Sequence, residues 1–191
     1  MILKNILGAL VLGLLTVGIF LFFRTGAHKN VTVEDSKIPD YQFFYAEHTG
    51  PYHEIMPKLL SVEKKFKNLD IECPRTFGLF LSDPERVNHD RLKSQVGCAF
   101  TIDEAPNLFA PIEGVSETFY PLPITSKDEL ARVKCYRGTF DGSPSLSAMK
   151  VYPKIKEKAK EEGVKLFTPA LEIYENEGDS VITKVFLCGK K

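Results

Sequence analysis

The pattern of apolar and polar positions in the N-terminal half predicts one strand, one helix and two further strands. Residues 41–47 are rich in aromatic side chains, which favours a strand, and the sequence HTGP at 48–51 predicts a turn. Apolar residues then recur at helical spacing between lysines and glutamates, which indicates an amphipathic helix. This apolar stripe comprises Ile55, Leu59, Val62 and Phe66. Strands at about 76–81 and 96–102 complete a β-α-β-β order.

The same order of elements returns in the C-terminal half. A strand at 130–140 leads into a helix, for which Ser143 is a candidate cap and Pro144 suits the first turn. Strands at 170–174 and 181–187 follow the helix. The second half therefore repeats the element order of the first.

Landmark residues of the two halves lie at nearly equal offsets, which indicates a duplicated unit. Gly50 and Gly142 are 92 positions apart, and Pro74 and Pro169 are 95 apart. Because one unit alone would leave a sheet edge and a helix face uncovered, the two are expected to share a sheet. The expected fold class is α+β, in which duplicated β-α-β-β units form one curved antiparallel sheet with both helices on one side.

A long apolar run precedes this predicted domain. Between Lys4 and Arg24 lie 19 residues without a charge, enough for a helix to cross a membrane. Residues 1–26 are therefore expected to form an uncleaved transmembrane signal anchor, with a cleaved signal peptide or a buried soluble helix as alternatives. This predicts a single-pass, N-terminally anchored membrane protein, with a linker at 27–39 and a domain at 40–189. The flanking charges are too balanced to assign the side of the membrane.

Charge and composition remove several classes of function. The chain carries 25 basic and 25 acidic residues, and beyond residue 30 the balance is 22 to 25, slightly acidic. A domain without a basic run has no electrostatic footprint for phosphate backbones, so no nucleic-acid partner is expected. No nucleophile elbow, zinc-protease, phosphate-loop or dinucleotide motif is present. We therefore assign no catalytic residue, metal or cofactor.

The four cysteines are too far apart in the sequence to form a CxxC pair, which disfavours a zinc knuckle or a thioredoxin-like redox centre. Most of them lie in or beside apolar runs, so they are interpreted as small buried hydrophobes. A disulfide remains open for an oxidising compartment, without an assigned pairing. They are Cys73, Cys98, Cys135 and Cys188.

Several short segments, in this order, resemble the GyrI-like small-molecule-binding domain, also called the AraC effector-binding domain, of the SOUL/gyrase-inhibitor-like superfamily. They are HTGPY at 48–52, GLFLSDP at 78–84, Arg91 before Val96-Gly97, and LEIY at 171–174. The resemblance covers about residues 40–188 and implies an eight-stranded antiparallel sheet with two helices and a ligand cleft between the halves. In drug-responsive members, a carboxylate at the floor of an aromatic cleft receives lipophilic cations, and the matching position here is Glu172.

The alternation in 170–174 places Glu172 and Tyr174 on one strand face together with Ala170. A carboxylate among aromatic rings suits a flat hydrophobic cation. The alternative is a glutamate at the sheet rim paired with a lysine such as Lys184. Further candidate walls of the site are Phe44, Tyr45 and Tyr136.

The expected function is a membrane-anchored, non-enzymatic module that binds small amphipathic, cationic or aromatic molecules. One alternative is a hydrolase that detoxifies reactive lipophilic compounds, since some members of the resembled family hydrolyse such compounds with Tyr and Glu side chains. Another is a membrane-anchored interaction or receptor module that binds protein partners and has no ligand.

Overall fold

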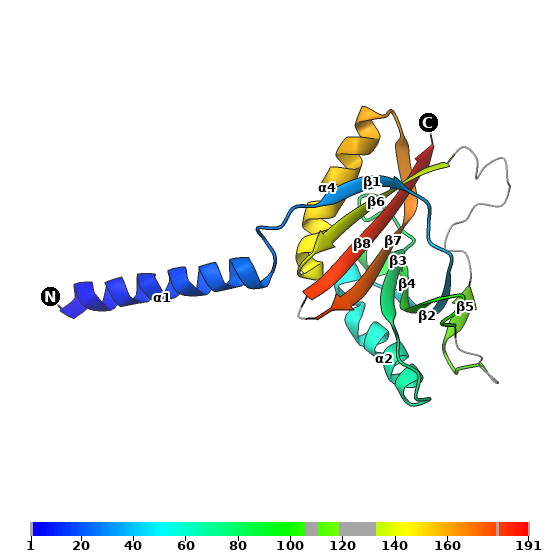
Figure 1. Ribbon diagram of the computed structural model, residues 1–191, viewed down its shortest axis with the longest axis horizontal. Coiled ribbons are helices and arrows are strands. Elements are labelled where there is room, and N and C mark those ends of the chain that lie inside the picture. The colour runs from blue at the N-terminus through cyan, green and yellow to red at the C-terminus, as the bar shows by residue number, and fades with distance from the viewer. Residues whose placement is uncertain (1, 106–110, 119–132, 179, 191) are drawn as a thin grey trace.

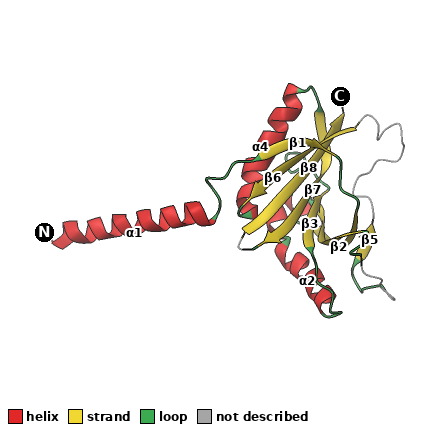
Figure 2. Ribbon diagram, viewed as in Figure 1, coloured by secondary structure: helices red, strands yellow, loops and turns green. Residues whose placement is uncertain are grey.

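The computed structural model describes residues 2–105, 111–118, 133–178 and 180–190. It is an α+β fold in which a single antiparallel sheet of eight strands is accompanied by three described helices (Figures 1 and 2). The helices are α1 (Ile2–Arg24), α2 (Met56–Lys67) and α4 (Pro144–Glu161), with 3-10 turns η1 (Tyr52–Glu54) and η2 (His89–Arg91). The strands are β1 (Thr32–Ser36), β2 (Tyr41–Thr49), β3 (Arg75–Phe80), β4 (Lys93–Thr101), β5 (Ser116–Thr118), β6 (Val133–Asp141), β7 (Lys165–Glu177) and β8 (Ser180–Lys190).

The order of strands across the sheet shows how the two halves meet. It runs β1-β6-β8-β7-β3-β4-β2-β5. The strands of the second unit (β6, β8 and β7) therefore lie beside those of the first (β3, β4 and β2), and the two units meet in the central antiparallel pair of β7 and β3. Each unit contributes its second strand to this junction. The two β-α-β-β units are therefore related by an approximate twofold axis through the β3–β7 pair.

Both α2 and α4 pack on the same face of the sheet, where they cover its apolar side chains. α2 lies over β2 and β4, and Val62 and Phe66 of this helix are fully buried against the strand residues Phe44 and Phe100. α4 lies over β6, β7 and β8. It approaches closely, because a Cβ at Gly138 would come within 2.3 Å of Val151 on the helix. The absence of a side chain at Gly138 thus allows α4 to lie close to the sheet.

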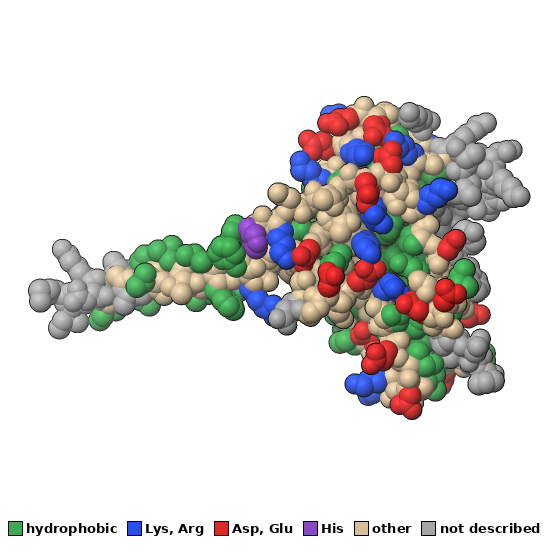
Figure 3. Space-filling view, in the orientation of Figure 1, with side chains coloured by type: hydrophobic (Ala, Val, Ile, Leu, Met, Phe, Trp, Pro, Cys, Tyr) green, Lys and Arg blue, Asp and Glu red, His purple; other side chains and the backbone are tan. Residues whose placement is uncertain are grey.

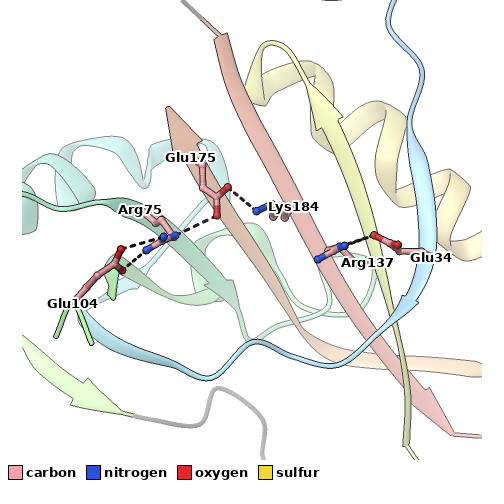
Figure 4. Close-up of polar contacts among 6 residues, drawn as sticks. All are labelled: Glu34, Arg75, Glu104, Arg137, Glu175 and Lys184. Carbon is pink, nitrogen blue, oxygen red and sulfur yellow. Dashed lines mark hydrogen bonds and ion pairs between the residues drawn. The ribbon is translucent and has the colours of Figure 1, made fainter. Parts of the chain in front are cut away.

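The opposite face of the sheet carries a second apolar cluster and a chain of ion pairs. Arg75 contacts Glu104 at 2.5 Å and Glu175 at 3.3 Å, and Lys184 contacts the other oxygen of Glu175 at 2.6 Å (Figure 4). The space-filling view shows charges of both signs interspersed over the side of the domain that faces the viewer (Figure 3).

The N-terminal helix requires a correction. Crossing a hydrocarbon core takes about 20 consecutive, predominantly apolar residues in one helix. Among the described helices, none is both long enough and apolar enough to cross a membrane. The expected transmembrane signal anchor at 1–26 and the single-pass localisation are therefore not supported. The segment was assigned from its long, apolar and uncharged sequence, and the helix that it forms does not meet this requirement.

Two edge strands were not expected from the sequence. β1 lies within 27–39, which was interpreted as a linker, yet it pairs along its whole length with β6. β5 lies between the strands predicted at 96–102 and 130–140, where no element was predicted, and it pairs with β2. Both strands are short and largely exposed, so their pattern carries no apolar alternation from which they could be predicted.

The cysteines are bonded in two pairs, Cys73 with Cys98 and Cys135 with Cys188. The interpretation of four unpaired hydrophobes is therefore wrong. Cys135 and Cys188 lie opposite each other on β6 and β8, whereas Cys73 reaches β4 from the segment after α2. These contacts depend on strand register and chain return, which the spacing of the cysteines along the sequence did not reveal.

Candidate functional site

A pocket of about 700 Å³ opens where the two halves of the domain meet. One side is formed by η1 and the start of α2, the other by the N-terminal half of α4, and the base by β3, β7 and β8. Its apolar lining includes Tyr52, Ile55, Phe80, Leu166, Phe167 and Leu187. The pocket thus lies over the β3–β7 junction, and each unit supplies part of its wall.

Glu172 lies at the base of this pocket and is 5% exposed. The Tyr152 hydroxyl donates a 2.7 Å hydrogen bond to Oε1, and the Tyr174 hydroxyl donates a 2.5 Å hydrogen bond to Oε2. Tyr174 stands on the same face of β7 two residues further on, whereas Tyr152 reaches down from α4. Each carboxylate oxygen therefore accepts one hydrogen bond from a phenol hydroxyl. The described residues provide no ion pair to Glu172.

The strand register determines which residues lie beside Glu172 at the base of the pocket. Its cross-strand neighbours are Gly78 on β3 and Val185 on β8. Gly78 has no side chain, and the ring of Phe80 lies over it, within 2.9 Å of where a Cβ would be. The register between β7 and β8 also shifts between Phe167 and Leu171, as in a β-bulge. Such irregularities bend a strand and re-aim its side chains, and here the segment lines the pocket.

Glu172, Tyr152 and Tyr174 form what we call the Glu172 cluster, and the environment opposes ionisation of all three side chains. Burial raises the pKa of Glu172, while the hydrogen bonds from Tyr174 and Tyr152 act in the opposite direction. Burial, followed by the neighbouring carboxylate, raises the pKa of both phenols well above the usual value of 10. The tyrosines are therefore neutral hydrogen-bond donors at physiological pH.

Ordered side chains hold the remaining walls in place. The Tyr52 hydroxyl donates to the carbonyl of Ser82 at 2.7 Å and accepts from the Ser82 amide at 3.0 Å. Its ring packs on Phe80 with 4.7 Å between centroids. At the mouth, Lys156 of α4 forms a 3.2 Å ion pair with Glu85 of the segment after β3. The backbone of Ser82 and the ring of Phe80 thus hold Tyr52 in the pocket wall.

The structure brings together only part of the predicted site. Glu172 and Tyr174 both line the pocket, and Lys184 is not a partner of Glu172 because it pairs with Glu175 on the other face. The sequence-based alternative of a rim ion pair with Lys184 is therefore wrong. The alternation along β7 was sufficient to place both pocket residues on one face.

The other three candidates lie elsewhere. Phe44 is buried beneath α2 and packs on Phe66 and Phe100, and the two strands β3 and β4 separate its strand from β7. Tyr45 points to the opposite face, where it packs on a separate apolar cluster. Tyr136 is fully buried, and its hydroxyl donates to Glu162 beyond the C-terminal end of α4, away from the pocket. These assignments placed aromatic residues in the site without knowledge of the strand order.

Sequence reasoning missed Tyr152 and Tyr52. Neither residue was among the candidates for the site, although Tyr52 ends the segment HTGPY at 48–52. Their hydroxyls, in an otherwise apolar stripe and beside a turn, were the available signal, because a buried tyrosine usually finds a hydrogen-bond partner. Among the described residues, no group of three or more His, Cys, Asp or Glu side chains could hold a metal ion.

Comparison with known proteins adds no relationship by sequence. No family model matches the chain, and no curated protein matches it.

Proposed function

We propose that this chain is a small-molecule-binding domain that receives an amphipathic, cationic ligand between its two halves. The observation that carries the proposal is the position of Glu172, a 5% exposed carboxylate at the base of an open, largely apolar pocket. Among the described residues it has two tyrosine donors and no cation. A ligand cation would supply the missing charge.

The energetic argument concerns the cost of a buried charge. Removing a carboxylate from water is unfavourable unless it is paired and hydrogen-bonded. The two phenols offset part of this cost, yet the pKa of Glu172 stays raised. A bound cation would favour the charged form and lower that pKa. Ligand binding is therefore expected to repay a penalty that the free protein carries.

The apolar lining suits a flat, hydrophobic body. A volume of about 700 Å³ falls within the usual range for sites of drug-sized ligands, roughly 300–1,000 Å³. The rings of Tyr52 and Phe80 offer apolar surface together with a face that attracts cations. The resemblance to GyrI-like domains supports the same function, because their cleft receives lipophilic cations on a matching carboxylate.

A hydrolase is a second candidate, favoured by the two hydroxyls bonded to one carboxylate. A neutral phenol beside a carboxylate can donate a proton to a leaving group or orient an attacking water. Hydrolysis of a reactive lipophilic electrophile by the purified protein, lost in both Tyr152→Phe and Tyr174→Phe, would favour this candidate. Binding without turnover would favour the first.

The deciding experiment uses the full chain and three probes of matched shape. Naphthylethylammonium and its trimethylated analogue are cations, and naphthylethanol is neutral. By calorimetry, at least one cation should bind more tightly than the alcohol, and Glu172→Gln should remove this preference while leaving the affinity for the alcohol nearly unchanged. Equal affinity of the wild-type protein for all three probes would contradict the proposal.

A further inference from the structure

The hydrogen-bonding capacity at the base of the pocket distinguishes between kinds of cation. The hydroxyls of Tyr152 and Tyr174 already donate their hydrogen bonds to Glu172. The atoms that remain available are the second lone pairs of the two carboxylate oxygens and the oxygens of the two phenols. The Glu172 cluster is therefore a surface of acceptors.

From this arrangement we infer that the pocket selects cations that bear N–H groups, such as protonated amines or amidines, over quaternary cations of the same size. This rests on the proposed function and narrows it to a chemical class. A protic cation can donate to the carboxylate and phenol oxygens, and hydrogen bonds between ionised partners are among the strongest in proteins. A quaternary cation brings charge without donors and leaves these oxygens unmatched.

The hydration of the two kinds of cation makes a preference for the primary ammonium a demanding test of the inference. A primary ammonium is more strongly hydrated than its trimethylated analogue, so a site that offered only apolar walls and a diffuse charge would prefer the quaternary ion. Preference for the primary ion therefore requires acceptors that replace its lost water. Glu172 and its two phenols supply up to four such oxygens within one cluster.

Two polar groups of the pocket wall are engaged elsewhere. The Tyr52 hydroxyl is already engaged with the Ser82 backbone, and Lys156 lies at the mouth in contact with Glu85. A ligand acceptor directed at the base would have to compete with Glu172 for a phenol proton. That exchange would leave a buried carboxylate oxygen without its donor, which is unfavourable.

The test compares the two cations on the unmodified full chain. Naphthylethylammonium should bind about tenfold or more tightly than its trimethylated analogue, a ratio typical of one charge-assisted hydrogen bond. Equal binding of the two cations, or tighter binding of the quaternary one, overturns the inference while both still exceed naphthylethanol. If neither cation exceeds naphthylethanol, the proposed function itself fails and the inference fails with it.

Tyrosine variants provide a second measurement that locates the acceptors. Tyr152→Phe and Tyr174→Phe each remove one phenol oxygen, so each should reduce the ratio of affinities for the primary over the quaternary cation. Tyr52→Phe is the matched control, because its hydroxyl is bonded to Ser82 and the ratio should not change. A reduction of the same size in all three variants would show that the preference does not arise at the Glu172 cluster.

Discussion

The hydroxyl of Tyr152 lies 2.7 Å from Oε1 of Glu172, and this contact joins α4 to the central strand β7. Apolar packing also holds α4 to the sheet, with Val151 and Ile155 fully buried in the interface, and Lys158 of the helix forms a 3.1 Å ion pair with Asp35 of β1. The bond from Tyr152, together with the bond from Tyr174, therefore fixes where the carboxylate points. A shift of α4 relative to the sheet should therefore alter the ionisation of Glu172. A change in the ionisation of Glu172 should likewise alter the position of α4.

Stability should depend on pH through Glu172. Burial raises the pKa of this carboxyl above the ordinary value of 4.5, so the folded state holds its proton more tightly than the unfolded state. The contribution to the free energy of unfolding is therefore largest at low pH and decreases as pH rises from 4.5 through the raised pKa. Glu172→Gln should remove this dependence on pH. At a pH above the raised pKa, it should also stabilise the ligand-free protein by about 1–3 kcal/mol. Denaturant unfolding at several pH values measures both effects, and an unchanged slope in the variant would contradict the burial of Glu172.

Removing either phenol should make Glu172 harder to ionise. Tyr152→Phe and Tyr174→Phe each delete a hydrogen bond that lowers the pKa of Glu172, so that pKa should rise further. At neutral pH each variant should lose about 1.5–3 kcal/mol of stability, the scale of a hydrogen bond to a charged group, and less where Glu172 is protonated. NMR titration of the glutamate carboxyl carbons reports the pKa directly. Tyr52→Phe should leave this titration unchanged, which separates the hydrogen bond from general loss of packing.

The core of the fold was accessible to sequence reasoning because its information is local. The strand alternation around Glu172 and the helical stripe that contains Val62 both follow from periodicity. The nearly equal offsets of two residue pairs, Gly50 with Gly142 and Pro74 with Pro169, then indicated duplication. One shared antiparallel sheet followed from the need to cover both units. The N-terminal membrane helix was wrong, as was the interpretation of the cysteines.

The site was harder to predict, because its members meet only through the order of the strands. Phe44 and Glu172 both face the helices, but β4 and β3 separate their strands, so no alternation rule could show that they do not meet. Tyr152 reaches Glu172 only because Gly138 allows α4 to approach the sheet so closely. Long-range contacts of this kind depend on packing distances that a single sequence does not display.

Gly138 should control the seating of α4. A Cβ there would lie 2.3 Å from Cγ1 of Val151 and 2.9 Å from Cδ1 of Ile155, so Gly138→Ala should push the helix outward. Overpacking of this kind typically costs about 1–3 kcal/mol. The displacement should also weaken the bond from Tyr152 and reduce affinity for naphthylethylammonium. Lys154→Ala, on the exposed side of the same helix, should change stability by less than about 0.5 kcal/mol. Equal stability of the two variants would show that α4 has room to adjust.

Arg75 should determine how the free energy of unfolding changes with pH in the acid range. Its hydrogen bond to Glu104, together with that from the Thr101 amide, lowers the pKa of Glu104 to about 2. The resulting stabilisation is present above the ordinary pKa of 4.5 and is lost as pH falls toward 2. Arg75→Gln should flatten this acid dependence, which urea unfolding between these pH values would measure. Arg137→Gln, which removes a more exposed ion pair with Glu34, is the matched control and should leave the profile nearly intact. A profile unchanged by Arg75→Gln would remove the role assigned to this network.

The two disulfides should stabilise the fold to different extents. Cys135 and Cys188 are 53 positions apart and enclose α4 and β7, whereas Cys73 and Cys98 are 25 apart. In the chain-entropy model a longer loop restricts the unfolded state more, so removal of either bond should cost about 2–4 kcal/mol, with the larger loss for the 135–188 pair. The paired variants Cys135→Ala/Cys188→Ala and Cys73→Ala/Cys98→Ala isolate each contribution in denaturant unfolding.

Reductant provides the control for this comparison. It should lower the melting temperature of the wild-type protein, and in each paired variant it should add only the effect of the bond that remains. Because Cys98 and Cys188 are almost fully buried, reduction should require opening of the structure and should be slow under native conditions. Alkylation of the unfolded, unreduced protein should label no cysteine. Labelling of all four would show that the bonds are absent, and the stability difference between the paired variants would then reflect packing alone.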